Sequence, residues 1–227
     1  MSAPELRIEA LRVNASDGRL LLDVPALTIP AGQSLALSGP SGAGKSTFLH
    51  ALSGLVRPAS GQVIWGGQDI AALSEDARAR FRRETLGMIF QDSHLFEELS
   101  ALGNAALAAA FSPAPARAGI RQRAADWLAR LGLDHAGSRA VDSFSGGERQ
   151  RIAVARALSG DAPVILADEP TAALDRANAD ALTDQLVALT ADHGRTLVVV
   201  THDPALAGRL DRRITLVDGQ IAGDDHA

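Results

Sequence analysis

The stretch that decides the fold is Gly39-Pro40-Ser41-Gly42-Ala43-Gly44-Lys45-Ser46. It matches the pattern G-x-x-x-x-G-K-[ST], in which glycines let backbone N–H groups turn toward a phosphate. The pattern requires a strand before the loop and a helix after it, and the sequence has a strand-like run at 33–38 and a helix-like run at 47–52. We therefore predict that the loop and the following Thr47 bind a nucleoside triphosphate at the positive end of a helix that begins at Lys45.

Lys45 is the only lysine of the chain, since the other 21 of its 22 lysine and arginine residues are arginines. A compact ammonium fits between phosphate oxygens, where a planar guanidinium is too wide. The hydroxyl group of Ser46 is predicted to coordinate Mg²⁺. The loop by itself indicates only that the chain binds a nucleoside triphosphate, because kinases, GTPases, recombinases and transport motors share it. A glycine-rich turn before a helix can also match the pattern by chance.

Composition excludes several classes of function. The 227 residues suffice for one large or two small domains with a hydrophobic core. The net charge of −5, with acidic residues and arginines interspersed, argues against broad nucleic-acid binding. The chain has no cysteine, which excludes disulfides, thiolate metal sites and cysteine nucleophiles. No apolar run approaches the length that crosses a bilayer, so any membrane span is expected on another chain.

The pattern of apolar runs predicts an α/β fold. Strands and helices alternate, and the fully apolar strands favour a mostly parallel sheet with helices on both faces, around the phosphate loop. Two early strands, at 6–13 and 20–29, predict an N-terminal antiparallel sheet. Residues 92–156 lack convincing strands and are interpreted as an inserted helical subdomain within a single domain of 1–227. The polar tail from Asp224 is expected to be frayed.

Polar residues follow three of the apolar strands. They are Gln91, the pair Asp168-Glu169, and His202. Because ligands of open parallel sheets bind at the carboxyl ends of the strands, we expect these side chains near the phosphate loop. A carboxylate suits a hard cation, so Asp168 is predicted to hold Mg²⁺, and Glu169 to polarise the attacking water. Taken singly, Asp168-Glu169 could be an acidic helix start and His202 an ordinary helix cap.

A second candidate anion site lies at Ser145-Gly146-Gly147-Glu148, just before a helix-like run. Ser145 is a good helix cap, and the glycines leave backbone N–H groups accessible at the helix start. One phosphate loop is enough to bind the phosphates of one nucleotide. A second site therefore suggests a nucleotide held between two copies of the chain, although a capped helix after a flexible turn would look similar.

These motifs together resemble the ATP-binding cassette (ABC) ATPase family over nearly the whole chain. The family motifs follow one another in the expected order: a Walker A loop at 39–46, a glutamine loop at Gln91, a signature at 145–150, a Walker B run ending at Asp168, then Glu169, a D-loop at 172–175, and a switch histidine at His202.

The resemblance implies a mechanism. Two cassettes would close head to tail over two molecules of ATP with Mg²⁺, so that Lys45 and Ser46 of one copy face Ser145 and Gly147 of the other. Glu169 would be the general base, and His202 would contact the γ-phosphate and hold the base. Asp175 would couple the two sites, and Gln91 would touch Mg²⁺ or the attacking water.

The run Ser-Gly-Gly-Glu and the ending Thr201-His202-Asp203-Pro204 look like the branch with lipoprotein-releasing and macrolide-export ATPases. The resemblance thus implies a homodimer on the cytoplasmic face of the inner membrane that energises a separate permease, leaning toward export or extraction. A regulatory cassette that signals to a cell-envelope or division partner is the alternative. A cassette acting on DNA or ribosomes is a third reading, which the acidic balance disfavours.

One departure from the family concerns the adenine base. Family members usually stack adenine on an aromatic residue before the Walker A loop, but the sequence has none between Leu6 and Gly39. Stacking contributes on the order of 1–3 kcal/mol per base. The base is therefore expected either to be held weakly or to rely on apolar and arginine contacts near Val13 to Arg19.

Overall fold

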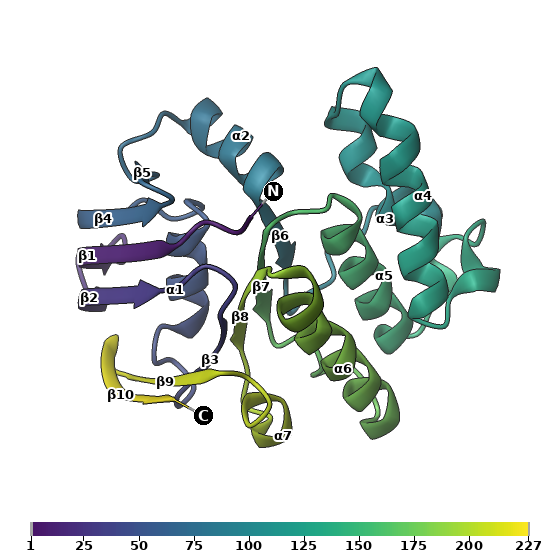
Figure 1. Ribbon diagram of the computed structural model, residues 1–227. Coiled ribbons are helices and arrows are strands. Elements are labelled where there is room, and N and C mark those ends of the chain that lie inside the picture. The colour runs from purple at the N-terminus through teal and green to yellow at the C-terminus, as the bar shows by residue number, and fades with distance from the viewer. Residues whose placement is uncertain (1, 227) are drawn as a thin grey trace.

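The computed structural model describes residues 2–226 and contains two sheets (Figure 1). The first sheet is antiparallel and has the strand order β2-β1-β4-β5. Its strands are β1 (Leu6–Asn14), β2 (Leu20–Ile29), β4 (Ser60–Trp65) and β5 (Gln68–Asp69). Buried and exposed residues largely alternate along β1, as expected for a strand with one face on a core. The predicted N-terminal antiparallel sheet is therefore confirmed.

The second sheet has the order β10-β9-β3-β8-β7-β6, and all its pairs are parallel except β10 with β9. Its strands are β3 (Ser34–Ser38), β6 (Leu86–Ile89), β7 (Val164–Asp168), β8 (Thr196–Val200), β9 (Arg212–Val217) and β10 (Gln220–His226). Every residue of β7 and β8 is buried. This is the mostly parallel sheet that the apolar runs predict.

Two hydrophobic cores lie on opposite faces of the parallel sheet. Alternate residues of β8 divide between them: Val198 and Val200 join one core, while Leu197 and Val199 join the other. The first core lies between the two sheets and encloses α1 (Lys45–Leu52). The second is covered by helices that include α6 (Arg176–His193) and α7 (Pro204–Ala207) (Figure 1). The phosphate loop thus runs from a central strand directly into a helix of the inter-sheet core.

The remaining helices are α2 (Glu75–Thr85), which Ser74 caps, and the group that follows Gln91. That group comprises α3 (Ala101–Ala105), α4 (Ala114–Arg130) and α5 (Gly146–Ser159), with 3₁₀ turns at Leu107–Phe111, Asp134–Ala136 and Val141–Ser143. Within 92–156 the only β pairing described is an isolated bridge between Ser100 and Ala140. Among residues 2–226, no helix combines the length and apolar character that a membrane span requires.

The expectation of a frayed tail from Asp224 is wrong. Strand β10 continues through His226, and Asp224 accepts two hydrogen bonds from Arg212, at 2.7 Å from Nε and 2.6 Å from Nη2. The residue Arg212 is only 8% exposed, and its guanidinium also donates to the carbonyl of Thr28. The two hydrogen bonds from Arg212 to Asp224 hold the pKa of the Asp224 carboxyl below its usual range. A buried cation needs a carboxylate partner, and the tail supplies it.

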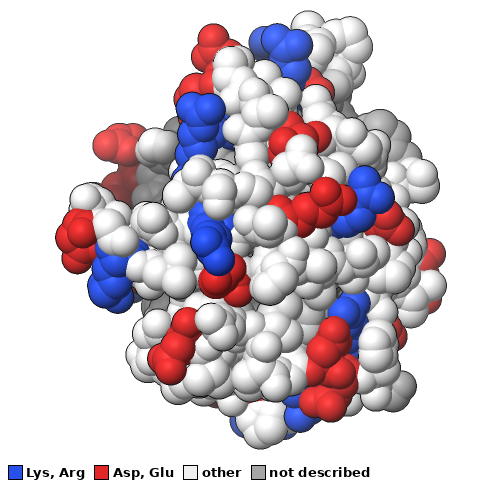
Figure 2. All heavy atoms as spheres, turned by 90° about the vertical axis from the view of Figure 1, so that its left-hand side faces the viewer, with Lys and Arg blue, Asp and Glu red and all other residues white. Residues whose placement is uncertain are grey.

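Positive and negative charges are interspersed on the face that carries the ends of strands β1, β2 and β4 (Figure 1, Figure 2). Figure 2 shows basic and acidic groups alternating there, without an extended patch of one sign. A polyanion needs a basic stripe, so this face gives no support to the reading of a nucleic-acid-binding cassette.

Candidate active site

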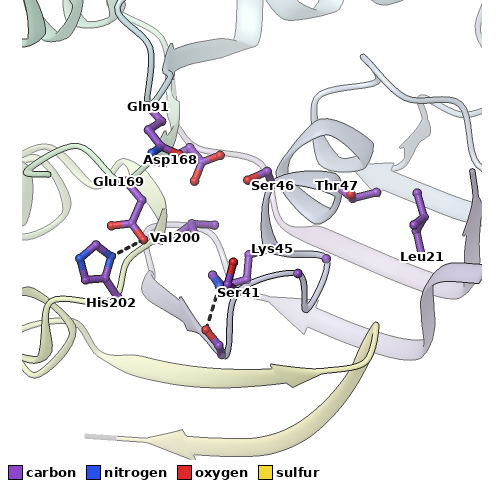
Figure 3. A pocket seen from close by; sticks show the side chains of 13 residues that line it. Leu21, Ser41, Lys45, Ser46, Thr47, Gln91, Asp168, Glu169, Val200 and His202 are labelled. Carbon is purple, nitrogen blue, oxygen red and sulfur yellow. Dashed lines mark hydrogen bonds and ion pairs between the residues drawn. The ribbon is translucent and has the colours of Figure 1, made fainter.

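A cavity of about 500 Å³ opens at the carboxyl ends of the parallel strands (Figure 3). The phosphate loop forms one wall, and the residues that follow β6, β7 and β8 form the other. Its lining residues are Leu21, Gly39, Ser41, Gly42, Gly44, Lys45, Ser46, Thr47, Gln91, Asp168, Glu169, Val200 and His202. The structure thus brings together all the polar strand-end residues that the sequence singles out, beside the predicted phosphate loop.

Glycine is required at two points of the loop. Gly39 has φ 143° and Gly44 has φ 96°, a region that favours glycine. A Cβ on Gly39 would lie 2.0 Å from the carbonyl oxygen of Leu216, and one on Gly44 would lie 2.8 Å from that of Leu21. The backbone of the loop therefore lies close to the backbone of both sheets at these two glycines.

Lys45 and the start of α1 give the cavity its positive side. The ammonium of Lys45 donates to the carbonyls of Gly39 and Pro40, both at 2.8 Å, which leaves one of its three N–H groups for a ligand. The N-terminus of α1 has no side-chain cap and no acidic residue in its first turn. Its N–H groups are therefore available to an anion. Pro40 and Ala43 belong to the loop but do not line the cavity.

Oxygen donors meet on the opposite side of the cavity. Asp168 is the last residue of β7 and is only 8% exposed, and in Figure 3 its carboxylate lies beside Gln91 and faces Ser46. Carboxylate, amide and hydroxyl oxygens are the ligands that Mg²⁺ prefers. Within residues 2–226 no group of three or more His, Asp or Glu is arranged to hold a metal by itself. This donor set suits an ion that is shared with phosphate oxygens.

Glu169 and His202 form a pair at the end of the cavity nearest β8. The carboxylate Oε1 of Glu169 lies 2.8 Å from Nδ1 of His202. The side chain of Glu169 is 11% exposed and that of His202 is 75% exposed. Glu169 has φ 47°, an uncommon conformation for a residue with a side chain. Its N–H donates to the carbonyl of Val200, which keeps the backbone in this conformation.

The signature residues lie outside the cavity of their own chain. Ser145 and Glu148 form a capping box: Glu148 accepts from the backbone N–H of Ser145 at 2.8 Å, and Ser145 Oγ accepts from that of Glu148 at 3.3 Å. Gly146 has open space where a Cβ would lie, whereas a Cβ on Gly147 would lie 3.1 Å from the carbonyl oxygen of Ala173. The signature therefore packs against the D-loop of the same chain.

Asp175 has a structural partner of its own. It caps α6, and its carboxylate accepts from the backbone N–H of Asn178 at 3.0 Å. The backbone and side-chain hydrogen bonds from Asn178 lower the pKa of Asp175. Asp175 does not line the cavity of its own chain.

Sequence reasoning missed two cavity residues, Leu21 and Val200. Val200 ends a buried strand, so its place could have been read from the strand-end rule. Leu21 comes from β2 of the other sheet, and no motif marks it. In Figure 3 it lies on the side of the cavity away from His202. The residues near Val13 to Arg19, which the sequence suggested for the base, do not line the cavity.

Comparison with known proteins identifies the family. A family model described as "ABC transporter" matches residues 22–172. The Macrolide export ATP-binding/permease protein MacB 1/2 of Paracoccus denitrificans (strain Pd 1222) is 43% identical over 226 residues, which are 98% of this chain and 33% of that protein. The Lipoprotein-releasing system ATP-binding protein LolD of Shewanella sp. (strain MR-4) is 40% identical over 227 residues, 98% of this chain and 97% of that protein.

The chain therefore spans about a third of the macrolide-export relative and nearly all of the lipoprotein-releasing one. Among solved structures, a dimeric ATP-binding cassette in a post-hydrolysis state, bound to ADP and Pi, superposes with a TM-score of 0.90 at 32% identity. That match covers 97% of this chain and 98% of the other. The resemblance seen in the sequence is thus confirmed: the chain belongs to the ABC transporter family.

Proposed function

We propose that the chain is the nucleotide-binding subunit of a membrane transporter. Two copies close over two molecules of Mg·ATP and drive a separate permease from the cytoplasmic face of the inner membrane, in export or in extraction of lipoproteins or small molecules. The observation that carries this proposal is the single cavity that joins Lys45, Asp168 and the Glu169–His202 pair. In the proposal the whole of 1–227 is one cassette, and 92–156 is its inserted helical subdomain.

Binding of the nucleotide falls to the phosphate loop. Residues 39–47 hold the phosphates through the Lys45 ammonium and, except for Pro40, through backbone N–H groups, while Ser46, Gln91 and Asp168 provide oxygen atoms for Mg²⁺. The bound ion would neutralise charge that develops on the phosphates. The donor set described above supports this assignment, because a hard cation with few protein ligands takes its other ligands from phosphate and water.

Hydrolysis requires a base that faces the terminal phosphate. A carboxylate only accepts hydrogen bonds, so the pair at 2.8 Å has its hydrogen on Nδ1 of His202, and the second carboxylate oxygen of Glu169 can take a proton from water. His202 holds the base in place and is exposed enough to contact the γ-phosphate.

The second copy completes the site. Ser145, Gly146, Gly147 and Glu148 lie away from the cavity of their own chain, at the N-terminus of the 14-residue helix α5. The hydroxyl of Ser145 accepts the capping hydrogen bond and keeps its own O–H to donate to a phosphate. Contact between Gly147 and the D-loop supports a role for Asp175 in coupling the two sites. The dimeric state named for the solved relative supports the same arrangement.

Relatives support the transport role. The macrolide-export relative is named as both ATP-binding protein and permease, while the lipoprotein-releasing relative, which this chain matches over nearly its whole length, is named as an ATP-binding protein. The cassette is therefore proposed to work with a permease, the function that the name of the macrolide-export relative joins to ATP binding.

Replacing Glu169 with Gln tests the proposal. We expect turnover of Mg·ATP to fall roughly 10²–10⁴-fold, because an amide cannot take the proton from water. Nucleotide binding should persist, and a dimer should accumulate with ATP in size-exclusion chromatography. Glu9→Gln, at an exposed site on β1, is the matched control and should hydrolyse ATP normally. Full activity of Glu169→Gln would remove Glu169 from the role of base.

A further inference from the structure

The segment 92–99, which directly follows Gln91, has no regular secondary structure but is held by side chains from two helices. Asn104 of α3, which is completely buried, accepts from the N–H of Phe96 at 2.8 Å and donates to the carbonyl of Phe96 at 2.9 Å. Arg156 of α5 donates to the carbonyls of Ser93 and His94, both at 2.7 Å. Backbone groups of an irregular loop are thus satisfied by specific side chains.

Arg156 is partly buried, and its guanidinium donates to backbone carbonyls. Burial lowers the pKa of its guanidinium, and no carboxylate contributes to that shift. The charge is balanced by carbonyl dipoles instead. A planar guanidinium can donate two parallel hydrogen bonds to the carbonyls of two consecutive residues, which an ammonium cannot do in the same geometry.

The residue that Arg156 holds is strained. His94 has φ 44°, in the left-handed region that residues with a side chain seldom adopt. Its ring also packs edge-on against Phe90, at 5.6 Å between centroids. A conformation of this kind persists only where the surroundings enforce it. Arg156 stabilises this conformation through its hydrogen bonds to the carbonyls of His94 and of the preceding Ser93.

Helix α5 links this segment to the signature. Its N-terminus carries Gly146 and Gly147, and Arg156 lies about 15 Å beyond Gly146 along the helix, at 1.5 Å per residue. Between them Gln150, which is 2% exposed, donates to the carbonyl of Phe90, directly before Gln91. One rigid helix therefore contacts the backbone on both sides of Gln91.

We propose that Arg156 is a positioning residue: it holds the 92–99 segment in its strained conformation, and through it fixes Gln91 in the cavity relative to the signature helix. The role in turnover rests on the proposed function. The hold on the segment does not, since it follows from the contacts of this chain alone. The expected effect is on the rate of the chemical step, because Arg156 touches neither the phosphate loop nor the base.

The test compares two arginines that both donate to backbone carbonyls, Arg156 of α5 and Arg123 of α4. Arg156→Met removes the proposed hold, whereas Arg123→Met removes a hydrogen bond from α4 to the carbonyl of Ser159, away from the segment. Amide hydrogen exchange of the full chain without nucleotide is measured first. We expect exchange in 92–99 to rise about tenfold or more in Arg156→Met and to stay unchanged in Arg123→Met. Unchanged exchange in Arg156→Met, or an equal rise in both variants, would overturn the inference.

Steady-state hydrolysis of Mg·ATP is the second measurement. We expect kcat of Arg156→Met to fall roughly 10- to 100-fold with KM within about twofold, and Arg156→Lys to recover part of the loss. Loss of exchange protection without any change in kcat would overturn the positioning role. If the unaltered chain neither binds nor hydrolyses ATP, the proposed function fails, while the exchange measurement still decides whether Arg156 holds the segment.

A second pair of variants tests the strain independently of Arg156. Asn tolerates the left-handed region and Val does not, and both lack the ring that packs on Phe90. His94→Val should therefore reproduce the rise in exchange in 92–99, and His94→Asn should not. Equal behaviour of the two variants would contradict the role of the strained backbone.

Discussion

The two glycine-rich helix starts differ in a way that the sequence motifs alone do not reveal. The start of α1 has no side-chain cap and no acidic residue in its first turn, and it carries Lys45. The start of α5 is closed by a reciprocal capping box and carries the carboxylate of Glu148. The first is built to receive an anion on its own. The second has satisfied part of its own N–H groups, so it is the weaker anion site, and in the proposed dimer its phosphate would be one already held by Lys45 of the other copy.

The largest effect is expected at the start of α1. Lys45→Met removes the ammonium while keeping most of the side-chain volume, and we expect hydrolysis of Mg·ATP to fall on the order of 100-fold or more. Binding should weaken as well, as measured by titration calorimetry. Arg7→Met, at an exposed position on β1, is the control. Normal turnover of Lys45→Met would contradict the role of the ammonium and, with it, the proposed difference between the starts of α1 and α5.

A smaller effect is expected at the start of α5. In Gly147→Val the new side chain would press on the carbonyl of Ala173 and on Leu174, since its Cβ lies 3.1 Å and 3.3 Å from their nearest atoms. We expect turnover and ATP-dependent dimerisation to fall about tenfold, while one copy still binds ATP within about twofold. The control is Gly160→Ala, because a Cβ there has open space at the far end of α5. Weakened ATP binding by the isolated copy would place the signature in the cavity of its own chain.

The smallest effect concerns the capping box itself. Glu148→Ala removes the hydrogen bond to the N–H of Ser145, and we expect the free energy of unfolding to fall by about 1 kcal/mol or less. That hydrogen bond lowers the pKa of Glu148 from its ordinary 4.5. The stabilisation is therefore complete above pH 4.5 and is lost as the pH falls through the lower value of the folded chain.

Urea unfolding of Glu148→Ala and of the unaltered chain at pH 7 and at acidic pH measures this difference. The two chains should differ at pH 7 and converge once Glu148 is protonated in the folded state. A difference that persists unchanged at low pH would mean that the carboxylate does not act through this cap.

Much of the fold and of the cavity could be predicted because the relevant signals are local. The phosphate loop fixes where β3 ends and where α1 begins, at Lys45. Fully apolar strands imply a parallel sheet, and the strand-end rule then brings Gln91, Asp168, Glu169 and His202 to one edge. Each of these inferences needs only a few consecutive residues and one general rule.

Contacts between distant segments could not be predicted. Leu21 reaches the cavity because the backbone of β2 packs against Gly44 and Gly219, where no Cβ is present. The tail was expected to be frayed since Asp224 lies in a polar run, but the partner that orders it is a buried arginine of the neighbouring strand. The hold of Arg156 on the 92–99 segment joins residues more than sixty positions apart.

The lone lysine has a practical consequence. Reagents that acylate or carbamylate side-chain amines can modify this chain at Lys45 and at no other side chain, because every other long basic residue is an arginine. The mass of one peptide, followed over time, would thus report occupancy of the cavity without a label or an engineered tag. Slower modification in the presence of nucleotide would show that the ligand covers Nζ of Lys45, the atom proposed to hold it.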